Sequence, residues 1–292
     1  MNDFHVFSYT HDDLSRLPTR PVDSSKGTFG RVLCVCGSRG MAGAAYLAAL
    51  SALRIGAGLV EILTPEENRV ILQTLLPEAI VTPYRSDEPE PLVIEAALRR
   101  ASSVVCGCGL GTTAQARFVL SRVLRSADVP TVLDADALNL ISRNRALLKY
   151  AEGKIITPHP LEMSRLIGLD VTEIQSDRTS VCHDFAKDHG LVCILKGHAT
   201  VVSDGTPHIY INNSGNSGMA TAGAGDVLAG IIGGLLAQSQ LSNLSMFETA
   251  AHGVYIHGLA GDVAASKLSE YSVIASDIID NLPAILKKAV VG

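Results

Sequence analysis

The stretch Gly215-Asn216-Ser217-Gly218-Met219-Ala220-Thr221-Ala222-Gly223-Ala224-Gly225-Asp226 runs directly into the apolar segment 227–237. Large aliphatic residues recur there at i, i+1, i+4 and i+5, a spacing typical of a buried helix. The first turn of a helix offers unpaired backbone N–H groups, and the helix dipole favours an anion beside them. The sequence therefore predicts that Gly223, Ala224 and Gly225 form an anion hole at the start of this helix.

Asp226 is the only formally charged side chain between Asp204 and Glu248. An isolated carboxylate beside an anion hole is suited to act as a catalytic base. Asp is also a favoured N-cap residue, a role that stabilises a helix by about 1 kcal/mol. From this segment alone, both roles remain open.

Upstream of this stretch, short apolar runs alternate with helical patterns along most of the chain. Such alternation predicts an α/β fold with a mostly parallel central sheet and helices on both of its faces. The expected strands are residues 31–36, 59–63, 103–106, 131–133, 154–157 and 191–195, and the expected helices are 42–55, 66–75, 113–124, 137–142 and 161–167.

Length and composition bound the class of protein. The chain has 292 residues, of which 47% are hydrophobic and 18% charged, with a net charge of -5. We expect a single domain over residues 1–292, with 1–26 as an N-terminal extension. No basic stripe favours nucleic acid as a partner. The low charge and positive mean hydropathy predict a homo-oligomer contact over part of the apolar surface.

Three features favour a cytoplasmic location without membrane contact. Residues 1–5 lack the pattern of a signal peptide, and 227–237 is too short to cross a bilayer. The six cysteines imply no disulfide framework. Four of them form the pairs Cys34/Cys36 and Cys106/Cys108, which we interpret as buried thiols because zinc sites usually space their cysteines more widely. A soft-metal site is the alternative.

Two expected strands end in glycine-rich turns, at residues 37–43 and 107–112. Neither turn has the spacing of a Rossmann turn or of a P-loop. Open α/β sheets bind ligands at the carboxyl ends of their strands, so the two turns predict a long ligand approached by backbone from two sides.

Carboxylates follow the next two strands, in Asp134-Ala135-Asp136-Ala137-Leu138-Asn139 and in Thr157-Pro158-His159-Pro160-Leu161-Glu162. Asp134, Asp136 and Glu162 are candidate ligands of Mg²⁺, directly or through water, beside phosphates. Asp136 and Thr157 could instead cap the following helices. His159 lies between two prolines whose rings fix the backbone, which favours contact with a ligand.

The expected strand 191–195 ends in Lys196-Gly197-His198-Ala199-Thr200. A lysine followed by glycine at a strand end can bring an ammonium group and open backbone to a nucleotide. A solvated lysine in a hairpin turn is the alternative.

Together these segments resemble the ADP/ATP-dependent NAD(P)H-hydrate dehydratases, a family with a ribokinase-like fold. The resemblance extends from about residue 27 to the C-terminus. It rests on Asp134-Ala135-Asp136-Ala137-Leu138-Asn139, Thr157-Pro158-His159-Pro160-x-Glu162-Met163, Lys196-Gly197-x-x-Thr200 and the glycine-rich block that ends at Asp226.

The resemblance implies a repair enzyme that dehydrates hydrated NADH or NADPH at the expense of ADP or ATP, with Mg²⁺ as cofactor. It implies Asp226 as the catalytic residue, a tetramer, and a stand-alone dehydratase without an epimerase domain. Ala44, Gly111, His159 and Asp226 would contact the hydrate, and Lys196, Gly197, His198, Ala199, Thr200 and Gly225 would line the adenine nucleotide.

Two residues depart from the family pattern, and two other functions remain as alternatives. Leu161 stands where glycine is usual, and Ser217 stands where proline is common, which puts the local backbone of the hydrate site in doubt. A small-molecule kinase of the same fold, acting on a vitamin precursor or sugar, would use the same base and anion hole. A non-catalytic nucleotide-binding regulator is the second alternative, and retention of Asp226 and of the full glycine-rich block argues against it.

The isolation of Asp226 generates the first prediction. We expect Asp226→Asn to keep the fold and nucleotide binding but to lower turnover by about 100-fold or more, because a general base is lost. Steady-state kinetics and the melting temperature of the same protein would test this. Turnover within a few-fold of wild type would assign Asp226 to helix capping instead.

Overall fold

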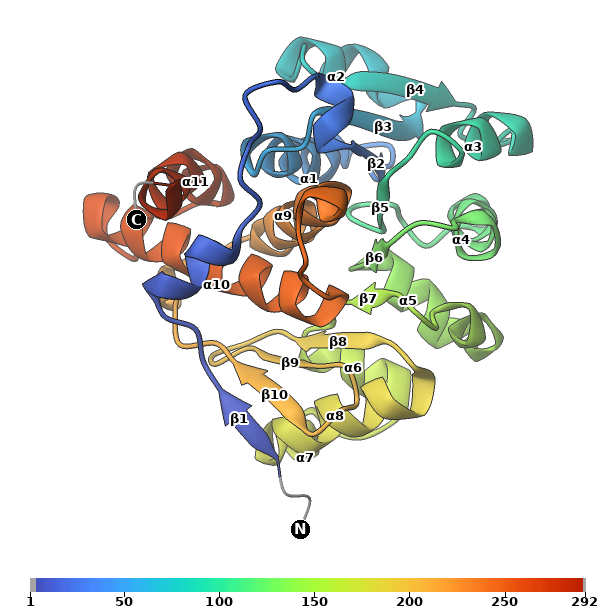
Figure 1. Ribbon diagram of the computed structural model, residues 1–292. Coiled ribbons are helices and arrows are strands. Elements are labelled where there is room, and N and C mark those ends of the chain that lie inside the picture. Colours follow the sequence, from blue (N-terminus) through green and yellow to red (C-terminus); the bar gives the residue numbers. More distant parts are fainter. Residues whose placement is uncertain (1–3, 291–292) are drawn as a thin grey trace.

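The computed structural model describes residues 4–290, and ten strands within this range form one sheet (Figure 1). The strand order is β1-β10-β9-β8-β7-β6-β5-β2-β3-β4. All neighbours are parallel except β9, which is antiparallel to β8 and β10, so the predicted mostly parallel sheet is confirmed. The strands are β1 (His5–Phe7), β2 (Arg31–Val35), β3 (Leu59–Pro65), β4 (Ile80–Tyr84), β5 (Ser103–Cys106), β6 (Thr131–Leu133), β7 (Ile155–Ile156), β8 (Val192–Leu195), β9 (Val201–Ser203) and β10 (His208–Ile211).

Helices cover both faces of this sheet, as the alternating pattern predicted (Figure 1). One face carries α1, α2, α9, α10 and α11, and the other carries α3 to α8. No helix in the described part of the chain is both long and apolar enough to cross a membrane. The helices are α1 (Ala42–Arg54), α2 (Arg69–Leu75), α3 (Pro91–Leu98), α4 (Ala114–Ser126), α5 (Asp136–Arg143), α6 (Pro160–Ile167), α7 (Val171–Ser176), α8 (Arg178–His189), α9 (Ala224–Ala237), α10 (Met246–Leu268) and α11 (Ala275–Val290).

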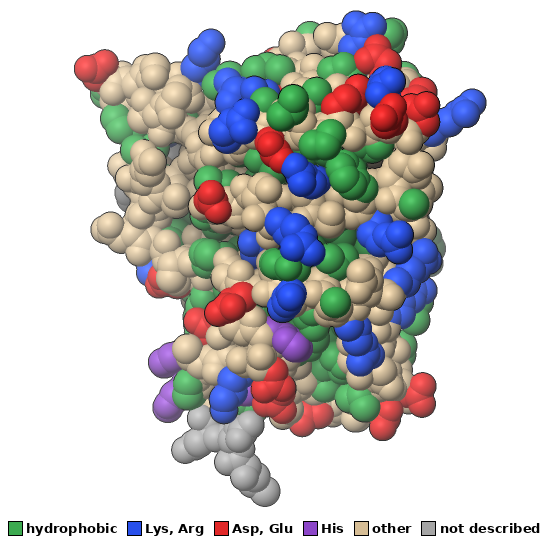
Figure 2. Space-filling view, turned by 90° about the vertical axis from the view of Figure 1, so that its right-hand side faces the viewer, with side chains coloured by type: hydrophobic (Ala, Val, Ile, Leu, Met, Phe, Trp, Pro, Cys, Tyr) green, Lys and Arg blue, Asp and Glu red, His purple; other side chains and the backbone are tan. Residues whose placement is uncertain are grey.

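Two apolar cores form because the central strands are buried on both sides. Along β2, Val32 and Cys34 belong to the core under α1 and α9, whereas Leu33 and Val35 belong to the core under α3 and α4. Successive side chains of a strand point to opposite faces, so a near-continuous apolar strand fills both cores. All six cysteines are free and buried, in agreement with their interpretation as buried thiols. The surface over α3, α4 and α5 carries charged side chains of both signs with apolar ones between them (Figure 2).

Part of the expected N-terminal extension is built into the sheet. β1 pairs in parallel with β10, where Phe7 lies opposite Tyr210. Tyr9 and Leu14, which follow β1, are buried in the core on the α10 side. Neither β1 nor the edge strand β4 was expected from the sequence. β1 is a short strand whose pairing depends on a partner remote in the chain, whereas β4 pairs with β3, the strand that precedes it in the sequence.

Helix α9 fits against α1 and β5 only because it carries glycine at the contacts. A Cβ atom on Gly230 would lie 2.1 Å from the carbonyl oxygen of Ala48 in α1. On Gly233 it would lie 2.3 Å from a methyl group of Val105 in β5. These separations are far below van der Waals contact, so the close packing of α9 excludes larger residues here.

The α1–α9 contact leads to a stability prediction. We expect Gly230→Ala to lower the free energy of unfolding by about 1–3 kcal/mol, because the added methyl group overpacks the helix crossing. Gly43→Ala is the matched control, since no heavy atom lies within 4 Å of a Cβ atom placed on Gly43 in α1. Denaturant unfolding of both variants measures the difference, and equal stabilities would refute the packing argument.

Candidate active site

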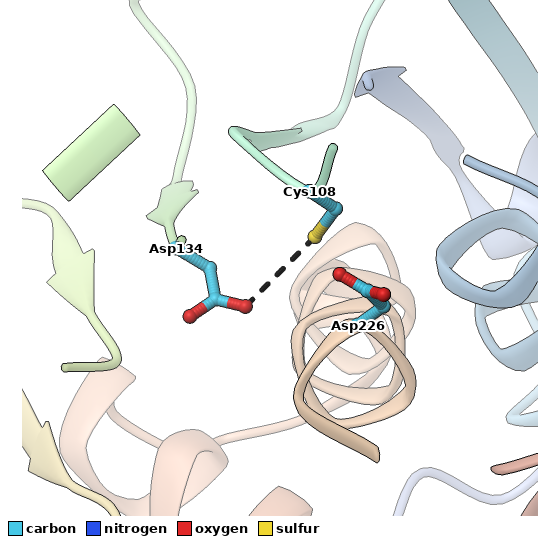
Figure 3. A group of neighbouring side chains, drawn as sticks. All are labelled: Cys108, Asp134 and Asp226. Carbon is cyan, nitrogen blue, oxygen red and sulfur yellow. Dashed lines mark hydrogen bonds between the residues drawn. The ribbon is translucent and has the colours of Figure 1, made fainter. Parts of the chain in front are cut away.

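Five side chains converge where the central parallel strands end. Cys108, Asp134, Thr157 and Lys196 follow β5, β6, β7 and β8, which are neighbours in the sheet, and Asp226 lies in the first turn of α9. Figure 3 shows Cys108, Asp134 and Asp226 facing one another. The carboxyl ends of neighbouring parallel strands meet at one edge of a sheet, so residues far apart in sequence share one site.

Asp134 is the centre of the hydrogen-bond network and is only 1% exposed. Its Oδ1 atom accepts hydrogen bonds from Thr157 Oγ1 at 2.6 Å and from Lys196 Nζ at 2.7 Å. A buried carboxylate needs such partners because burial of an unpaired charge is costly. The hydroxyl group of Thr157 therefore donates to Asp134, and Thr157 does not cap α6.

The ammonium group of Lys196 lies close to both the Asp134 carboxylate and the expected anion hole. Its ammonium group lies 3.9 Å from Glu162 Oε2 as well as 2.7 Å from Asp134. Burial acts to lower the pKa of Lys196, but the two carboxylates outweigh burial and raise it. A Cβ atom on Gly225 would lie 3.4 Å from Lys196 Nζ, so this ammonium faces the first turn of α9. The arrangement combines a fixed positive charge with a helix N-terminus, as a phosphate site requires.

Asp226 has the environment of a base. The N-cap of α9 is Gly223, at φ 89°, so Asp226 does not cap the helix. A side chain at Gly223 would overlap Leu47, whose Cδ1 atom lies 2.4 Å from a built Cβ. Burial, followed by the negative charge of Asp134, raises the pKa of Asp226 to about 6. The backbone amide of Ala224 is one of the three amides expected in the anion hole. It donates a long hydrogen bond, at 3.4 Å, to the carbonyl oxygen of Thr221.

His159 caps helix α6, which is a role the sequence analysis did not assign to it. Its Nδ1 atom accepts hydrogen bonds from the amides of Leu161 and Glu162, both at 3.2 Å, and Glu162 Oε2 accepts from the His159 amide at 2.8 Å. Burial and the charge of Lys196 lower the pKa of His159, so its imidazole is neutral near neutral pH. The ring is 44% exposed. Its Nε2 atom lies 3.4 Å from Glu162 Oε1.

Leu161 and Glu162, whose amides both donate to His159, have different environments. Burial raises the pKa of Glu162 to about 7, although the charge of Lys196 opposes this. Leu161, which replaces the usual glycine, is an exposed residue whose amide takes part in the cap. The altered residue is thus accommodated at the surface.

The two glycine-rich turns lie against each other. The Gly37 amide donates to the Cys108 carbonyl at 2.8 Å. A Cβ atom on Gly109 would lie 2.7 Å from the Cβ of Ala44. Asp136 Oδ2 accepts from the Gly111 amide at 2.8 Å, so Asp136 holds this turn, and the N-cap of α5 is Ala135. Ala44 and Gly111, two expected hydrate contacts, therefore lie around one turn.

The three carboxylates expected to bind Mg²⁺ do not form a cluster of their own. Asp136 is engaged by Gly111, and Glu162 by His159. Among His, Cys, Asp and Glu side chains of the described residues, only Cys108, Asp134 and Asp226 form a group of three with donor atoms within 4.8 Å of one another. The thiol of Cys108 was not expected at the site, because its sequence pattern is that of an ordinary buried cysteine.

The loop 196–200 is held by Arg178 of α8, a second residue that the sequence did not reveal. Its guanidinium donates to the carbonyl groups of Leu195, at 2.7 Å, and of His198. The loop bends through Gly197, at φ 147°, and Ala199, at φ 54°. This bend keeps backbone atoms of the loop next to Lys196. A long-range contact between a helix arginine and loop carbonyls leaves no local sequence signal.

Similar proteins share the sequence pattern and the fold. The sequence profile described as NAD(P)H-hydrate dehydratase matches residues 32–284. This chain belongs to the NAD(P)H-hydrate dehydratase family. It is 42% identical to the ADP-dependent (S)-NAD(P)H-hydrate dehydratase of Neisseria meningitidis over 248 residues, which are 84% of this chain and 80% of that protein.

Solved structures of similar proteins place this dehydratase-family chain in the ribokinase-like fold. A ribokinase-like superfamily protein from Enterococcus faecalis has a TM-score of 0.87 and 32% identity, covering 97% of this chain and 96% of its own. The ADP/ATP-dependent NAD(P)H-hydrate dehydratase of Bacillus subtilis, co-crystallised with ATP/Mg²⁺, has a TM-score of 0.80 and 29% identity, covering 96% and 97%. Other curated relatives are longer, and the chain spans about half, 52%, of the length of the first two.

The capping role of His159 can be separated from any role in ligand binding. We expect His159→Ala to lower the free energy of unfolding by about 1 kcal/mol, because α6 loses its cap. His159→Asn should keep most of that stability, since its amide oxygen can accept from the same N–H groups. Denaturant unfolding measures both.

The same pair of variants tests the imidazole itself. A rise in KM for the hydrated dinucleotide that both variants share would come from the lost ring, because only one of them loses the cap. Equal destabilisation of the two variants would contradict the capping assignment.

Proposed function

We propose that this chain dehydrates hydrated NADH or NADPH to the intact dinucleotide, coupled to cleavage of ADP or ATP. The observation that carries the proposal is the pairing of a half-buried carboxylate, Asp226, with a phosphate-type site made by Lys196 and the first turn of α9. Membership of the NAD(P)H-hydrate dehydratase family supports the choice of substrate.

In the proposed reaction, Asp226 removes the proton of the hydrate hydroxyl group. The hydroxyl oxygen then attacks the terminal phosphoryl group of the nucleotide, and the nucleotide leaves one phosphate shorter. A hydroxyl is a poor leaving group, but a phosphate ester is a good one. The lone pair of the ring nitrogen expels phosphate, and loss of a ring proton restores the dihydronicotinamide. The pKa of Asp226, at about 6, suits this base because it is ionised at neutral pH yet still basic.

Electrostatic stabilisation would come from groups that are already in place. The ammonium of Lys196 lies beside the first turn of α9, and together with the amides of the Gly223–Gly225 turn it would stabilise the charge that develops on the transferred phosphoryl group. Because Asp134 and Glu162 keep Lys196 charged, the ammonium needs no reorganisation when the nucleotide binds. The nucleotide would lie along the loop 196–200 that Arg178 supports.

The hydrate would lie between the two glycine-rich turns and His159. Ala44 and Gly111 bound that space on one side, and the neutral imidazole of His159 offers its Nε2 atom from α6. In this arrangement Asp226 would stand between the hydrate and Lys196. The order hydrate, base, phosphate matches the direction of phosphoryl transfer.

Mg²⁺ fits the oxygen donors of this site in part. Asp134 Oδ2 and the Asp226 carboxylate are oxygens of the type that Mg²⁺ prefers, and the ion would keep several waters beside them and bind the nucleotide phosphates. When bound there, Mg²⁺ would neutralise phosphate charge. Asp136 and Glu162 are engaged elsewhere and would act only through water.

A cytoplasmic location and a tetrameric assembly remain predictions.

A kinase that stops after phosphorylating an alcohol is the competing function, so the test must detect the dehydrated product. With hydrated NADH or NADPH and ADP or ATP crossed in pairs, we expect near-ultraviolet absorbance of the reduced nicotinamide to appear, with ADP tested first because the Neisseria relative is named ADP-dependent. Phosphorylated hydrate without that absorbance would favour the kinase. No nucleotide turnover would favour a binding regulator.

The same assay carries a pH prediction. The base works ionised, so kcat/KM should fall as the pH drops through about 6, the pKa of Asp226, and level off above it. Circular dichroism over the same range checks that the protein stays folded. A flat profile through this range would contradict the assignment of Asp226 as the base.

A further inference from the structure

The group of Cys108, Asp134 and Asp226 offers more than a phosphoryl-transfer site requires (Figure 3). One sulfur and two carboxylates lie within 4.8 Å of one another. They come from the turn after β5, the end of β6 and the first turn of α9, which are firmly packed elements. Phosphoryl transfer uses the carboxylates, but it gives no role to the thiol.

One carboxylate oxygen in this group is poorly satisfied. Asp134 Oδ1 accepts two short hydrogen bonds, whereas Oδ2 has only the Cys108 thiol, at 3.9 Å. Asp134 is 1% exposed, and Figure 3 shows Oδ2 directed toward the thiol and Asp226. A buried carboxylate oxygen without an N–H or O–H donor is costly and indicates a missing positive partner.

The donor set selects a particular class of cation. Zn²⁺ accepts cysteine sulfur together with carboxylate oxygen in tetrahedral sites, with Zn–S about 2.3 Å and Zn–O about 2.0–2.2 Å. These bond lengths put the donors about 3.5 Å apart, so modest side-chain rotations would close the present group around the ion. Mg²⁺ is a hard cation that does not select a thiolate. A fourth position would remain open to water.

Charge favours the same occupant. Asp134, Asp226 and the ammonium of Lys196, counted without the neighbouring Glu162, carry one net negative charge while the thiol is protonated. A divalent cation that displaces the thiol proton into solvent, as the metal–sulfur bond forms, leaves the group neutral. Neutral sites are preferred in a buried environment.

We propose that Cys108, Asp134 and Asp226 form a binding site for a soft divalent cation, with Zn²⁺ as the first candidate. Bound there, the ion occupies the carboxylate of Asp226 and inhibits the enzyme reversibly. Metal binding itself does not depend on the proposed dehydratase function. Only the inhibition depends on that function, so the metal site and the dehydratase function can be refuted separately.

The direct test uses cobalt spectroscopy on the full chain after removal of metals with a chelator. Titrated Co²⁺ should produce the intense near-ultraviolet charge-transfer band of a cobalt–thiolate bond, and Zn²⁺ should abolish it by displacement. Cys108→Ala should lose the band. Cys193→Ala is the matched control, because Cys193 is an equally buried thiol in the core on the opposite face of the sheet.

Affinity and activity supply two further measurements. Loss of partners that only support a metal ligand costs about 10- to 100-fold in affinity, so loss of a ligand in Cys108→Ala should raise the Zn²⁺ dissociation constant by at least about tenfold. Asp226→Asn should weaken Zn²⁺ binding while keeping the thiolate band. In the dehydratase assay, Zn²⁺ should inhibit wild type at concentrations that spare Cys108→Ala, and a chelator should reverse the inhibition.

Absence of a thiolate band in the wild-type protein would overturn the proposal. So would a band that persists in Cys108→Ala, or equal Zn²⁺ affinity in wild type, Cys108→Ala and Asp226→Asn. If the thiolate band appears and no dehydration is found with any nucleotide, the metal site stands and the proposed function fails.

Discussion

The buried ion pair between Lys196 and Asp134 is the interaction on which the site depends. It joins the ends of β6 and β8, which lie on either side of β7, and Thr157, which follows β7, completes it. A carboxylate as buried as Asp134 is tolerated only with such partners. The pair therefore locks three strand ends into one arrangement and fixes an ammonium group at the start of α9.

Burial and the charges of this pair together set the ionisation of the residues around it. The negative charge of Asp134 adds to burial in raising the pKa of Asp226 to about 6. Burial raises the pKa of Glu162 to about 7 against the opposing charge of Lys196, while Lys196 helps to keep His159 neutral. Burial and this ion pair thus keep a carboxylate of raised pKa, a neutral histidine and a charged ammonium group close together. Groups whose environments push their pKa values apart are typical of catalytic sites.

Much of the site could be predicted from local pattern. The glycine-rich turn, the apolar helix behind it and the carboxylates after successive strands are local features, and the structure places Asp226, Asp134 and Lys196 together. Their finer roles could not be predicted. Thr157 and Asp136 had the spacing of helix caps, yet Thr157 serves Asp134 and Asp136 holds Gly111, while His159 takes the cap of α6. Cap preferences are worth about 1 kcal/mol, so a buried carboxylate that needs a donor overrides them.

The sequence by itself determined the α/β class, the parallel centre of the sheet and the chemistry at each strand end, because apolar periodicity and glycine placement are local properties of the chain. Tertiary structure alone decided that β1 pairs with β10, that Arg178 supports the loop 196–200 and that the Cys108 thiol faces two carboxylates. These contacts join residues brought together by strand order. Strand order follows from the packing of two whole cores, and no single segment of sequence encodes it.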